Sequence, residues 1–267
     1  MTLPPFDERD LYTGLAALHW SAYDDPTPDH DFFKRVIEQS GTPALDVGCG
    51  AGRLLRRFLA AGLEVDGVDI SADMLAVCRA KCQAEGLTPT LYESPMQALD
   101  LPRRYRTIFI PCGTFVCVMD REAALETLRR FHRHLLPGGT LVFNIYTCDY
   151  DYSQPFDPAR YPTEWKFHVE KTFPEPGKRL VVERRLTWQD PIEQYDAEER
   201  RYRLYQDEAL VAEEVHAGQY HWYFQHELLL MLRLAGFDDV SVKGDFTDED
   251  FGPQHQGSMV FLARRDG

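Results

Sequence analysis

The sequence predicts an α/β domain with a doubly wound, mostly parallel sheet that is interrupted by an antiparallel β insertion. Between residues 44 and 146, short β-branched runs alternate with stretches in which apolar residues recur every three or four positions. Strands that alternate with helices are typical of βαβ units and therefore of a parallel sheet. After residue 150 the apolar period changes to two, which indicates antiparallel hairpins.

Four strands are expected in the first half of the chain, at ALDVG, EVDGVDI, TIFIP and TLVFNIY. The segments between them have helical spacing, and Ser71 is well placed to cap the second helix. Pro137, Gly138 and Gly139 are expected to stop the helix before the strand over 140–146. Further along, HELLLMLRLAG is expected to form a helix, and DDVSVKG and SMVFLARR to form a final strand pair.

The chain is therefore expected to consist of one domain with two additions. Residues 1–40 mix Pro-Asp punctuation with short amphipathic pieces, which predicts an N-terminal helical flap. Residues 150–225 are the antiparallel insertion, which we expect to act as a substrate lid. The α/β domain itself is expected at 41–149 and 226–267.

The composition of the chain limits the kinds of partner that it can bind. The chain has 267 residues and a formal net charge of −14, whereas binding to nucleic acid or an anionic membrane needs clustered Lys and Arg. The start, MTLPPFDERD, lacks the basic and apolar regions of a signal peptide, and no apolar stretch is long enough to span a bilayer. Six cysteines without a CxxC pair indicate a reducing compartment. We expect a cytoplasmic monomer or homodimer without nucleic-acid or membrane partners.

The chemistry is concentrated in the turn after the first strand, where Gly48, Gly50 and Gly52 precede a helix. Glycine allows the backbone to turn sharply and to approach a ligand closely, while the N–H groups of a helix start favour a carboxylate. Asp69 stands at the tip of the next strand, about 20 residues further on, where an acid binds ribose hydroxyls. This combination predicts a nucleotide-like cofactor.

The spacing of the glycines distinguishes between two cofactors. A dinucleotide site has the form GxGxxG, and the position of its third glycine is occupied here by Arg53. The stretch ALDVGCGAGRLLRRFLAAGLEVDGVDISADML resembles motif I and the acidic loop of class I S-adenosylmethionine-dependent methyltransferases, in their small-molecule branch. The resemblance implies a seven-stranded Rossmann-like methyltransferase fold with S-adenosylmethionine as cofactor. An NAD-dependent oxidoreductase is the alternative that this spacing disfavours.

Further matches carry the resemblance over most of the chain and imply contacts with the cofactor. SPMQALDLP resembles the segment that frames adenine, although Pro95 stands where many relatives have an acid. IFIPCGTF resembles the strand tip beside the methyl donor, and SAYDDP the flap that closes over the cofactor. The expected cofactor-binding residues are Tyr23, Asp46, Gly48, Gly50, Gly52, Asp69, Ile70, Met74, Met96, Gln97 and Cys112. For Met74, core packing is an equal alternative, and Tyr23 is equally well explained as a surface aromatic residue.

The expected substrate side contains Phe115, Trp222 and Tyr223, with His221 as a candidate general base. The alternative is that the residues from His221 onward form an aromatic seam that packs the hairpins on the sheet. No metal site is expected, because the pair Cys78 and Cys82 has no matching second pair of ligands. The basic run Arg200, Arg201 and Arg203 is expected to be the solvated face of a strand.

Together these patterns predict an enzyme that methylates a small molecule at nitrogen or oxygen by in-line displacement. The sulfonium donor is already activated, so positioning in a dry pocket supplies most of the catalysis and a base is optional. The alternative is an S-adenosylmethionine-binding protein without transfer activity, acting as a sensor or a partner subunit.

Overall fold

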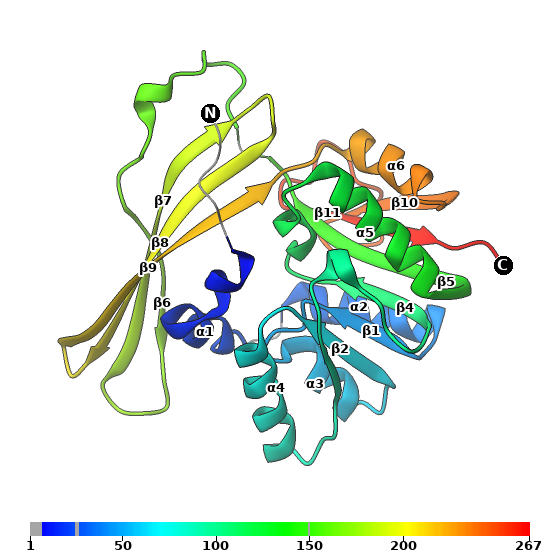
Figure 1. Ribbon diagram of the computed structural model, residues 1–267, viewed down its shortest axis with the longest axis horizontal. Coiled ribbons are helices and arrows are strands. Elements are labelled where there is room, and N and C mark those ends of the chain that lie inside the picture. The colour runs from blue at the N-terminus through cyan, green and yellow to red at the C-terminus, as the bar shows by residue number, and fades with distance from the viewer. Residues whose placement is uncertain (1–6, 25–26, 149) are drawn as a thin grey trace. The chain divides into compact units, whose positions relative to one another are not determined.

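The structure is a computed structural model that describes residues 7–24, 27–148 and 150–267 (Figure 1). The chain forms two compact units, each built from two segments of the sequence. Unit 1 comprises residues 1–24 and 149–221, and unit 2 comprises residues 25–148 and 222–267. These bounds differ from the predicted segments mainly near the start, because residues 28–40 belong to unit 2.

Unit 2 is built on a seven-stranded sheet with the order β10-β11-β5-β4-β1-β2-β3. Its strands are β1 (Ala44–Val47), β2 (Val65–Asp69), β3 (Thr90–Glu93), β4 (Tyr105–Ile110), β5 (Leu135–Tyr146), β10 (Asp239–Gly244) and β11 (Ser258–Arg264). The first five strands pair in parallel, whereas β11 runs antiparallel to both of its neighbours. The predicted fold class, a mostly parallel seven-stranded sheet, is confirmed.

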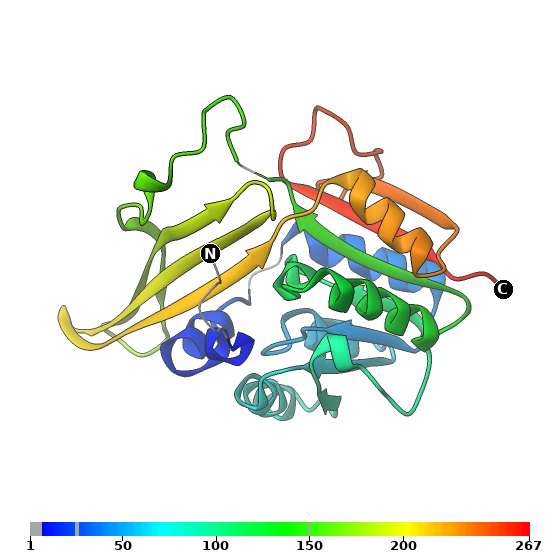
Figure 2. The same cartoon turned by 45° about the horizontal axis from the view of Figure 1, so that its top comes forward.

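Helices cover both faces of this sheet (Figures 1 and 2). They are α2 (Pro28–Ser40), α3 (Arg53–Ala60), α4 (Ala72–Ala84), α5 (Arg121–His134) and α6 (Gln225–Leu234). One apolar core contains Phe33 of α2 and Phe58 of α3, together with Val142 of β5. The other core contains Phe131 of α5 and the next strand residue, Phe143. Neighbouring residues of β5 thus point into opposite cores, which is why this strand is apolar without alternation.

Two details of unit 2 differ from the expectation. Helix α5 ends at His134, and β5 begins at Leu135, so that residues 137–139 lie within the strand, where its pairing with β4 is irregular. The guanidinium of Arg265 donates hydrogen bonds to the carbonyl oxygens of His132 and Leu135, at 2.9 and 2.6 Å. This distant side chain satisfies the helix end, so the glycines are not needed to stop the helix. Strand β3, which was not among the four expected strands, is a short and partly exposed edge.

Unit 1 is a four-stranded antiparallel sheet with the order β6-β7-β8-β9, as the change of period predicted. Its strands are β6 (Lys166–Thr172), β7 (Lys178–Asp190), β8 (Tyr195–Gln206) and β9 (Ala209–His221), and its helices are η1 (Glu8–Tyr12), α1 (Gly14–Ser21) and η4 (Pro158–Arg160). Helix α1 packs on the sheet through a core that contains Leu15 and Tyr202. The Glu214 carboxylate accepts a hydrogen bond from the Leu15 N–H at 2.7 Å and so caps α1 from strand β9.

The basic run in β8 is not a solvated face. Arg200 is largely buried and forms an ion pair with Glu198 at 2.6 Å. Arg201 and Arg203 point to the opposite face of the strand, where both pair with Glu183. The expectation was wrong because the paired acids come from alternate positions of the same strand and from the neighbouring strand, which the sequence spacing does not reveal.

Cys78 and Cys82 are fully buried in the core beneath α4. Across the described residues, no group of three His, Cys, Asp or Glu side chains is arranged to hold a metal ion. Among the helices of the described ranges, none is long and apolar enough to cross a membrane.

Candidate functional site

The candidate site lies at the carboxyl edge of the sheet of unit 2, around the end of β1. Strand β1 has β2 on one side and β4 on the other, so the chain order reverses at this point. Ligands of open α/β sheets bind at such a switch point, outside the carboxyl ends of the strands. The loops after β1 and β4 approach closely here, because a Cβ added at Gly48 would lie 2.7 Å from the Thr114 side chain.

The loop after β1 has positive φ angles at its three glycines, a conformation that glycine adopts readily. Gly48, Gly50 and Gly52 have φ angles of +72°, +52° and +82°, which L side chains rarely adopt. Val68 of β2 accepts hydrogen bonds from the N–H groups of Gly48 and Cys49, at 2.8 and 3.1 Å. These two hydrogen bonds fix the loop to the second strand.

Asp69 closes this loop from the tip of β2. Its two carboxylate oxygens accept hydrogen bonds from the Gly50 N–H at 2.8 Å and from the Ser71 N–H at 2.9 Å. Burial raises the pKa of Asp69, and these two hydrogen bonds oppose the shift. A carboxylate oxygen has more than one acceptor position, so Asp69 retains capacity for the hydroxyls of a ribose.

Asp46 lies in β1 beneath the loop and is almost completely buried. Its Oδ1 atom has no hydrogen-bond partner among the described residues. Burial raises the pKa of Asp46 to about 8. An orphaned buried carboxylate is costly unless a cation or a donor faces it, and the ammonium of an amino-acid ligand meets both needs. The residues of this site therefore fit the methionine part of S-adenosylmethionine.

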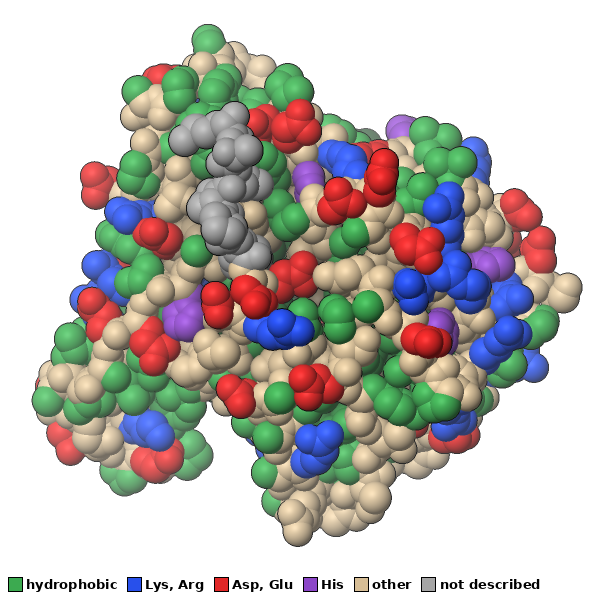
Figure 3. Space-filling view, viewed as in Figure 1, with side chains coloured by type: hydrophobic (Ala, Val, Ile, Leu, Met, Phe, Trp, Pro, Cys, Tyr) green, Lys and Arg blue, Asp and Glu red, His purple; other side chains and the backbone are tan. Residues whose placement is uncertain are grey.

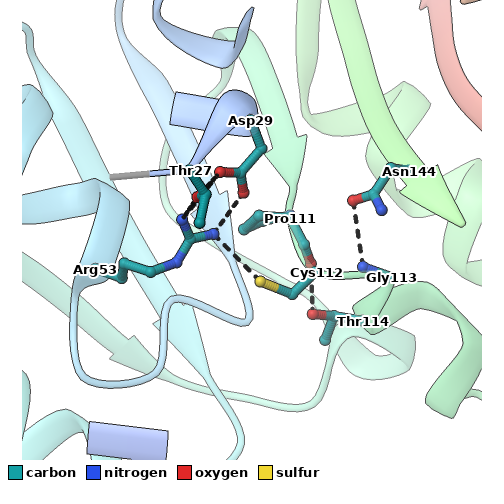
Figure 4. Close-up of polar contacts among 8 residues, drawn as sticks. All are labelled: Thr27, Asp29, Arg53, Pro111, Cys112, Gly113, Thr114 and Asn144. Carbon is teal, nitrogen blue, oxygen red and sulfur yellow. Dashed lines mark hydrogen bonds and ion pairs between the residues drawn. The ribbon is translucent and has the colours of Figure 1, made fainter. Parts of the chain in front are cut away.

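A second polar cluster joins the first turn of α2 to the glycine loop (Figure 4). The Arg53 guanidinium binds both carboxylate oxygens of Asp29, at 2.5 and 3.0 Å, and donates to the Thr27 hydroxyl at 2.7 Å. The same guanidinium lies 3.2 Å from the Sγ atom of Cys112 at the tip of β4. Arg53 thus links α2 to the loops after β1 and β4.

The tip of β4 has an unusual backbone. Cys112 has a φ of +58°, and Gly113 follows at +69° before the short helix η3 (Thr114–Cys117). The Gly113 N–H donates to the Asn144 side-chain oxygen at 3.2 Å (Figure 4). The half-exposed ring of Tyr146 lies over Gly113, because an added Cβ there would be 2.9 Å from a ring carbon. Cys112 and Tyr146 are therefore presented at the same edge as the glycine loop.

The predicted adenine contacts follow β2 and β3 in unit 2. Met74 is buried in α4, and a Cβ added at Gly50 would lie 3.4 Å from its terminal methyl group. Met74 is thus both a core residue and a wall of the loop. Met96 and Gln97 lie in the short helix η2 (Met96–Ala98), and Ile70 follows Asp69; all three are half-buried.

Tyr23, predicted to bind the cofactor, and the residues predicted for the substrate side are divided between the two units. Tyr23 and His221 lie in unit 1, where the Tyr23 ring contacts the His19 ring edge to face and His221 Nδ1 is 2.8 Å from the Gln194 carbonyl oxygen. Phe115 and Tyr223 lie in unit 2, fully buried and 5.7 Å apart between ring centroids. Trp222 is also buried. Phe115 and Tyr223 therefore pack on each other within the core of unit 2.

Five residues at this edge contact the loops, although the sequence did not predict these contacts. They are Thr27, Asp29, Arg53, Asn144 and Tyr146. The one available signal was local: Thr-Pro-Asp at residues 27–29 is the usual start of a helix, with a cap and an acid in the first turn. Its pairing with Arg53 is a contact between segments 24 residues apart.

A glycine loop after the first strand, an acid at the tip of the second, and a mostly parallel sheet with an antiparallel last strand are the features that the resemblance to class I S-adenosylmethionine-dependent methyltransferases implies. Comparison with known proteins agrees. Residues 44–139 match the family described as "Methyltransferase domain". Residues 44–139 thus form a methyltransferase domain, for which S-adenosylmethionine is the cofactor.

Three relatives illustrate the similarity. A dTDP-3-amino-3,6-dideoxy-alpha-D-glucopyranose N,N-dimethyltransferase of Streptomyces fradiae is 35% identical over 101 residues, which cover 37% of each chain. Among solved structures, an S-adenosylmethionine-dependent methyltransferase from Clostridium acetobutylicum has a TM-score of 0.72 at 16% identity, covering 92% of this chain and 94% of that one. The sugar N-methyltransferase KedS8 from Streptoalloteichus has a TM-score of 0.70 at 17% identity, covering 100% and 97%. At these identities the two structures establish the fold alone.

The matched regions span between 37% and 56% of the first three curated relatives. These matches are thus confined to part of each relative.

Proposed function

We propose that this chain transfers the methyl group of S-adenosylmethionine to a nitrogen or oxygen atom of a small molecule. The observation that supports the proposal most directly is the buried Asp46 with its orphaned oxygen beneath the glycine loop. A site with this donor set accommodates an amino-acid ammonium beside a nucleoside. The similarity to proteins named as amino-sugar and sugar N-methyltransferases supports a small acceptor, and nitrogen as its reacting atom.

In this proposal each set of residues at the edge of unit 2 binds one part of S-adenosylmethionine. Gly48, Gly50, Gly52 and Asp46 hold the methionine part, Asp69 holds the ribose, and Ile70, Met74, Met96 and Gln97 surround the adenine. Cys112 lies beside the methyl donor. To the predicted set we add Tyr146 as a candidate contact of the acceptor, since it is half-exposed over the tip of β4.

S-adenosylmethionine supplies a methyl group that is bound to a positively charged sulfonium sulfur. The leaving group is a neutral thioether, which needs no acid to protonate it. The residues of the chain therefore have to exclude water and hold the nucleophile in line with the carbon–sulfur bond, about 3 Å from the methyl carbon. An amine nucleophile has only to arrive neutral, whereas a hydroxyl benefits from a base. His221 remains our candidate for that base.

Incubating the protein with methyl-labelled S-adenosylmethionine and panels of amine and hydroxyl acceptors, nucleotide-linked amino sugars among them, tests the proposal. We expect S-adenosylhomocysteine to form in step with a labelled acceptor. Binding of S-adenosylmethionine without turnover across such panels would favour a binding protein. Failure to bind S-adenosylmethionine would contradict the proposal itself.

We further expect the protein to act in the cytoplasm as a monomer or homodimer, without a nucleic-acid partner. The net charge is −14, and on the face shown in Figure 3 basic side chains are interspersed with acidic ones. Binding to nucleic acid requires basic groups gathered along one surface. Sedimentation of the purified protein tests the oligomeric state, and sedimentation with a DNA or RNA duplex tests whether nucleic acid binds.

Replacing Asp69 with Ala is expected to weaken S-adenosylmethionine binding by about 2 kcal/mol, the usual cost of losing charge-assisted hydrogen bonds to a buried hydroxyl pair. The Asn variant should lose less, because its amide oxygen still accepts the Gly50 N–H that the carboxylate binds at 2.8 Å. Calorimetric titration of both variants measures the difference. Wild-type affinity in Asp69→Ala would mean that the ribose is held elsewhere.

Replacing His221 or Trp222 with Ala is expected to leave S-adenosylmethionine affinity near that of the wild type while turnover falls by about 100-fold. The Nδ1–H of His221 donates a hydrogen bond to the Gln194 carbonyl oxygen. In the neutral ring the other nitrogen, Nε2, then carries no proton and is the atom that could take a proton from a substrate. If the acceptor is a hydroxyl, the loss in His221→Ala should shrink as the pH rises, because more acceptor is then ionised without help. Equal losses of turnover, affinity and thermal stability would instead identify the pair as an aromatic seam.

A further inference from the structure

One face of the sheet of unit 1 carries a row of basic residues that crosses all four strands. Lys166 of β6 pairs with Arg184 of β7, Arg184 pairs with Arg200 of β8, and Arg200 pairs with His216 of β9. Directly opposed residues in antiparallel strands point to the same face, and like charges in that position are unfavourable. Packing alone does not explain such a row.

The acids of this face are already engaged. Glu198 pairs with Arg200 at 2.6 Å, and Glu214 binds both His216 and the start of α1. Neither Arg184 nor Lys166 forms an ion pair or hydrogen bond with any residue that the structure describes, and both side chains are exposed. Within the described part of the chain, this face therefore holds positive charge on Arg184 and Lys166 that no ion pair compensates, although the net charge of the whole chain is −14.

Aromatic rings hold the buried member of the row in place. The Arg200 guanidinium carbon lies 5.5 Å from the centroid of Trp20 and 5.7 Å from that of Tyr220. The Tyr220 ring folds back over Gly218, where an added Cβ would meet its hydroxyl at 2.8 Å. The Arg200 guanidinium thus lies near two aromatic rings, and the exposed Arg184 is directly opposite it on the neighbouring strand.

A buried imidazole lies next to this row. His19 of α1 is fully buried against the rings of Trp20, Tyr23 and Tyr202, and neither of its ring nitrogens has a hydrogen-bond partner among the described residues. Burial, together with the charges of Arg200, His168 and Lys171, lowers its pKa to about 3. His19 is therefore neutral at neutral pH, and it has one N–H donor that nothing described satisfies.

We propose that this face of unit 1 binds an oxyanion, a phosphate or a carboxylate group, with Arg184 and Arg200 as its principal ligands. The proposal goes beyond the proposed function and does not depend on the donor site of unit 2. Guanidinium groups are suited to this task because their planar donors match the oxygens of phosphate and carboxylate in pairs. The flanking Trp20 and Tyr220 supply flat surface for the apolar part of the same molecule.

The test uses the full chain without S-adenosylmethionine and two probes, inorganic pyrophosphate and malonate, titrated at constant ionic strength. Constant ionic strength matters because exposed charges are screened by salt. We expect at least one probe to bind, and the stronger of the two identifies the kind of oxyanion. Failure of both probes to bind at millimolar concentration would overturn the proposal.

Arg184→Ala is the informative variant, because the side chain is exposed and its loss leaves the core intact. Its matched control is Arg185→Ala, the next residue, which points to the other face, pairs with Glu199 at 2.7 Å and lies 4.6 Å from the Trp165 ring centroid. We expect Arg184→Ala to weaken probe binding by about tenfold, the loss of one charge-assisted contact, and Arg185→Ala to leave it unchanged. Equal weakening in both variants would contradict the site.

S-adenosylmethionine affinity is measured in parallel for the same proteins. It should be unaffected by both substitutions, because neither residue belongs to the donor site. If the chain bound pyrophosphate or malonate through Arg184 but failed to bind S-adenosylmethionine, the oxyanion site would stand and the proposed function would fail. The reverse result, donor binding without probe binding, would reject the oxyanion site alone.

Discussion

Gly50→Val is expected to remove S-adenosylmethionine binding, with a loss of at least about 100-fold in affinity. Gly50 has a φ of +52°, and among the described atoms its added Cβ would come within 4 Å of the Met74 methyl group alone, at 3.4 Å. The new side chain would therefore project into the space that the loop leaves for a ligand rather than into the core. Because the Gly50 N–H also binds Asp69, a shift of the loop would displace the ribose acid as well.

The matched control is Gly86→Val. Gly86 has a φ of +72°, and no atom of the residues that the structure describes lies within 4 Å of its added Cβ, so this variant has the same kind of backbone strain at an open position. Both variants should lose some thermal stability, but only Gly50→Val should lose the ligand in a calorimetric titration. Retention of wild-type affinity in Gly50→Val would reject the assignment of the loop.

Gly52 is a poor site for the same experiment. An added Cβ at Gly52 would lie 2.6 Å from the buried sulfur of Cys78. A valine there would disturb the core beneath α4, so lost binding would not separate a ligand contact from misfolding.

S-adenosylmethionine affinity is expected to rise with pH by up to tenfold per pH unit below about pH 8, because Asp46 must ionise to bind the ammonium. The pKa of Asp46 in the free protein is about 8, so most molecules are protonated at neutral pH. Binding should then release up to one proton, which calorimetry in buffers of different ionisation enthalpy detects. Affinity that does not change with pH would contradict the contact between Asp46 and the ammonium.

Asp46→Asn provides the control for this dependence. At low pH the neutral amide resembles the protonated acid, so the variant and the wild type should bind alike, and their affinities should separate as the pH rises. The unfolding of the free protein gives an independent check. Because the folded state raises the pKa of Asp46 above its usual value of 3.8, ionisation lowers the stability of the wild type as the pH rises from there towards about 8. Asp46→Asn should therefore be the more stable protein at the upper end of that range.

The parts of the fold that the sequence predicted correctly are those in which the signal is local. Strand β1, the glycine loop, α3 and β2 follow one another within 26 residues, from Ala44 to Asp69, and the turn chemistry lies within the same stretch. The end of α5 was placed too late because its carbonyl groups are satisfied by Arg265, more than a hundred residues away. A cap supplied from so far along the chain leaves no pattern around the helix end.

The candidate site shows the same division. Asp46, the three glycines and Asp69 could be named from spacing, and the structure brings them together. The cluster of Arg53 with Asp29 and Cys112 could not be named, because each member comes from a different element. In unit 1, alternation along β8 places Arg200 and Arg201 on opposite faces, but the sequence does not show which face is covered by α1.

The cap of α1 by Glu214 bears on the order in which the chain acquires structure during synthesis. Helix α1 has only eight residues, too few to persist alone in water, and its N-terminal N–H is satisfied by a side chain that the ribosome delivers 199 residues later. Helix α1 must therefore wait, unfolded, while most of unit 2 emerges. Its apolar side chains, Leu15 among them, stay exposed through that interval, and chaperones that bind short apolar segments have their best opportunity there.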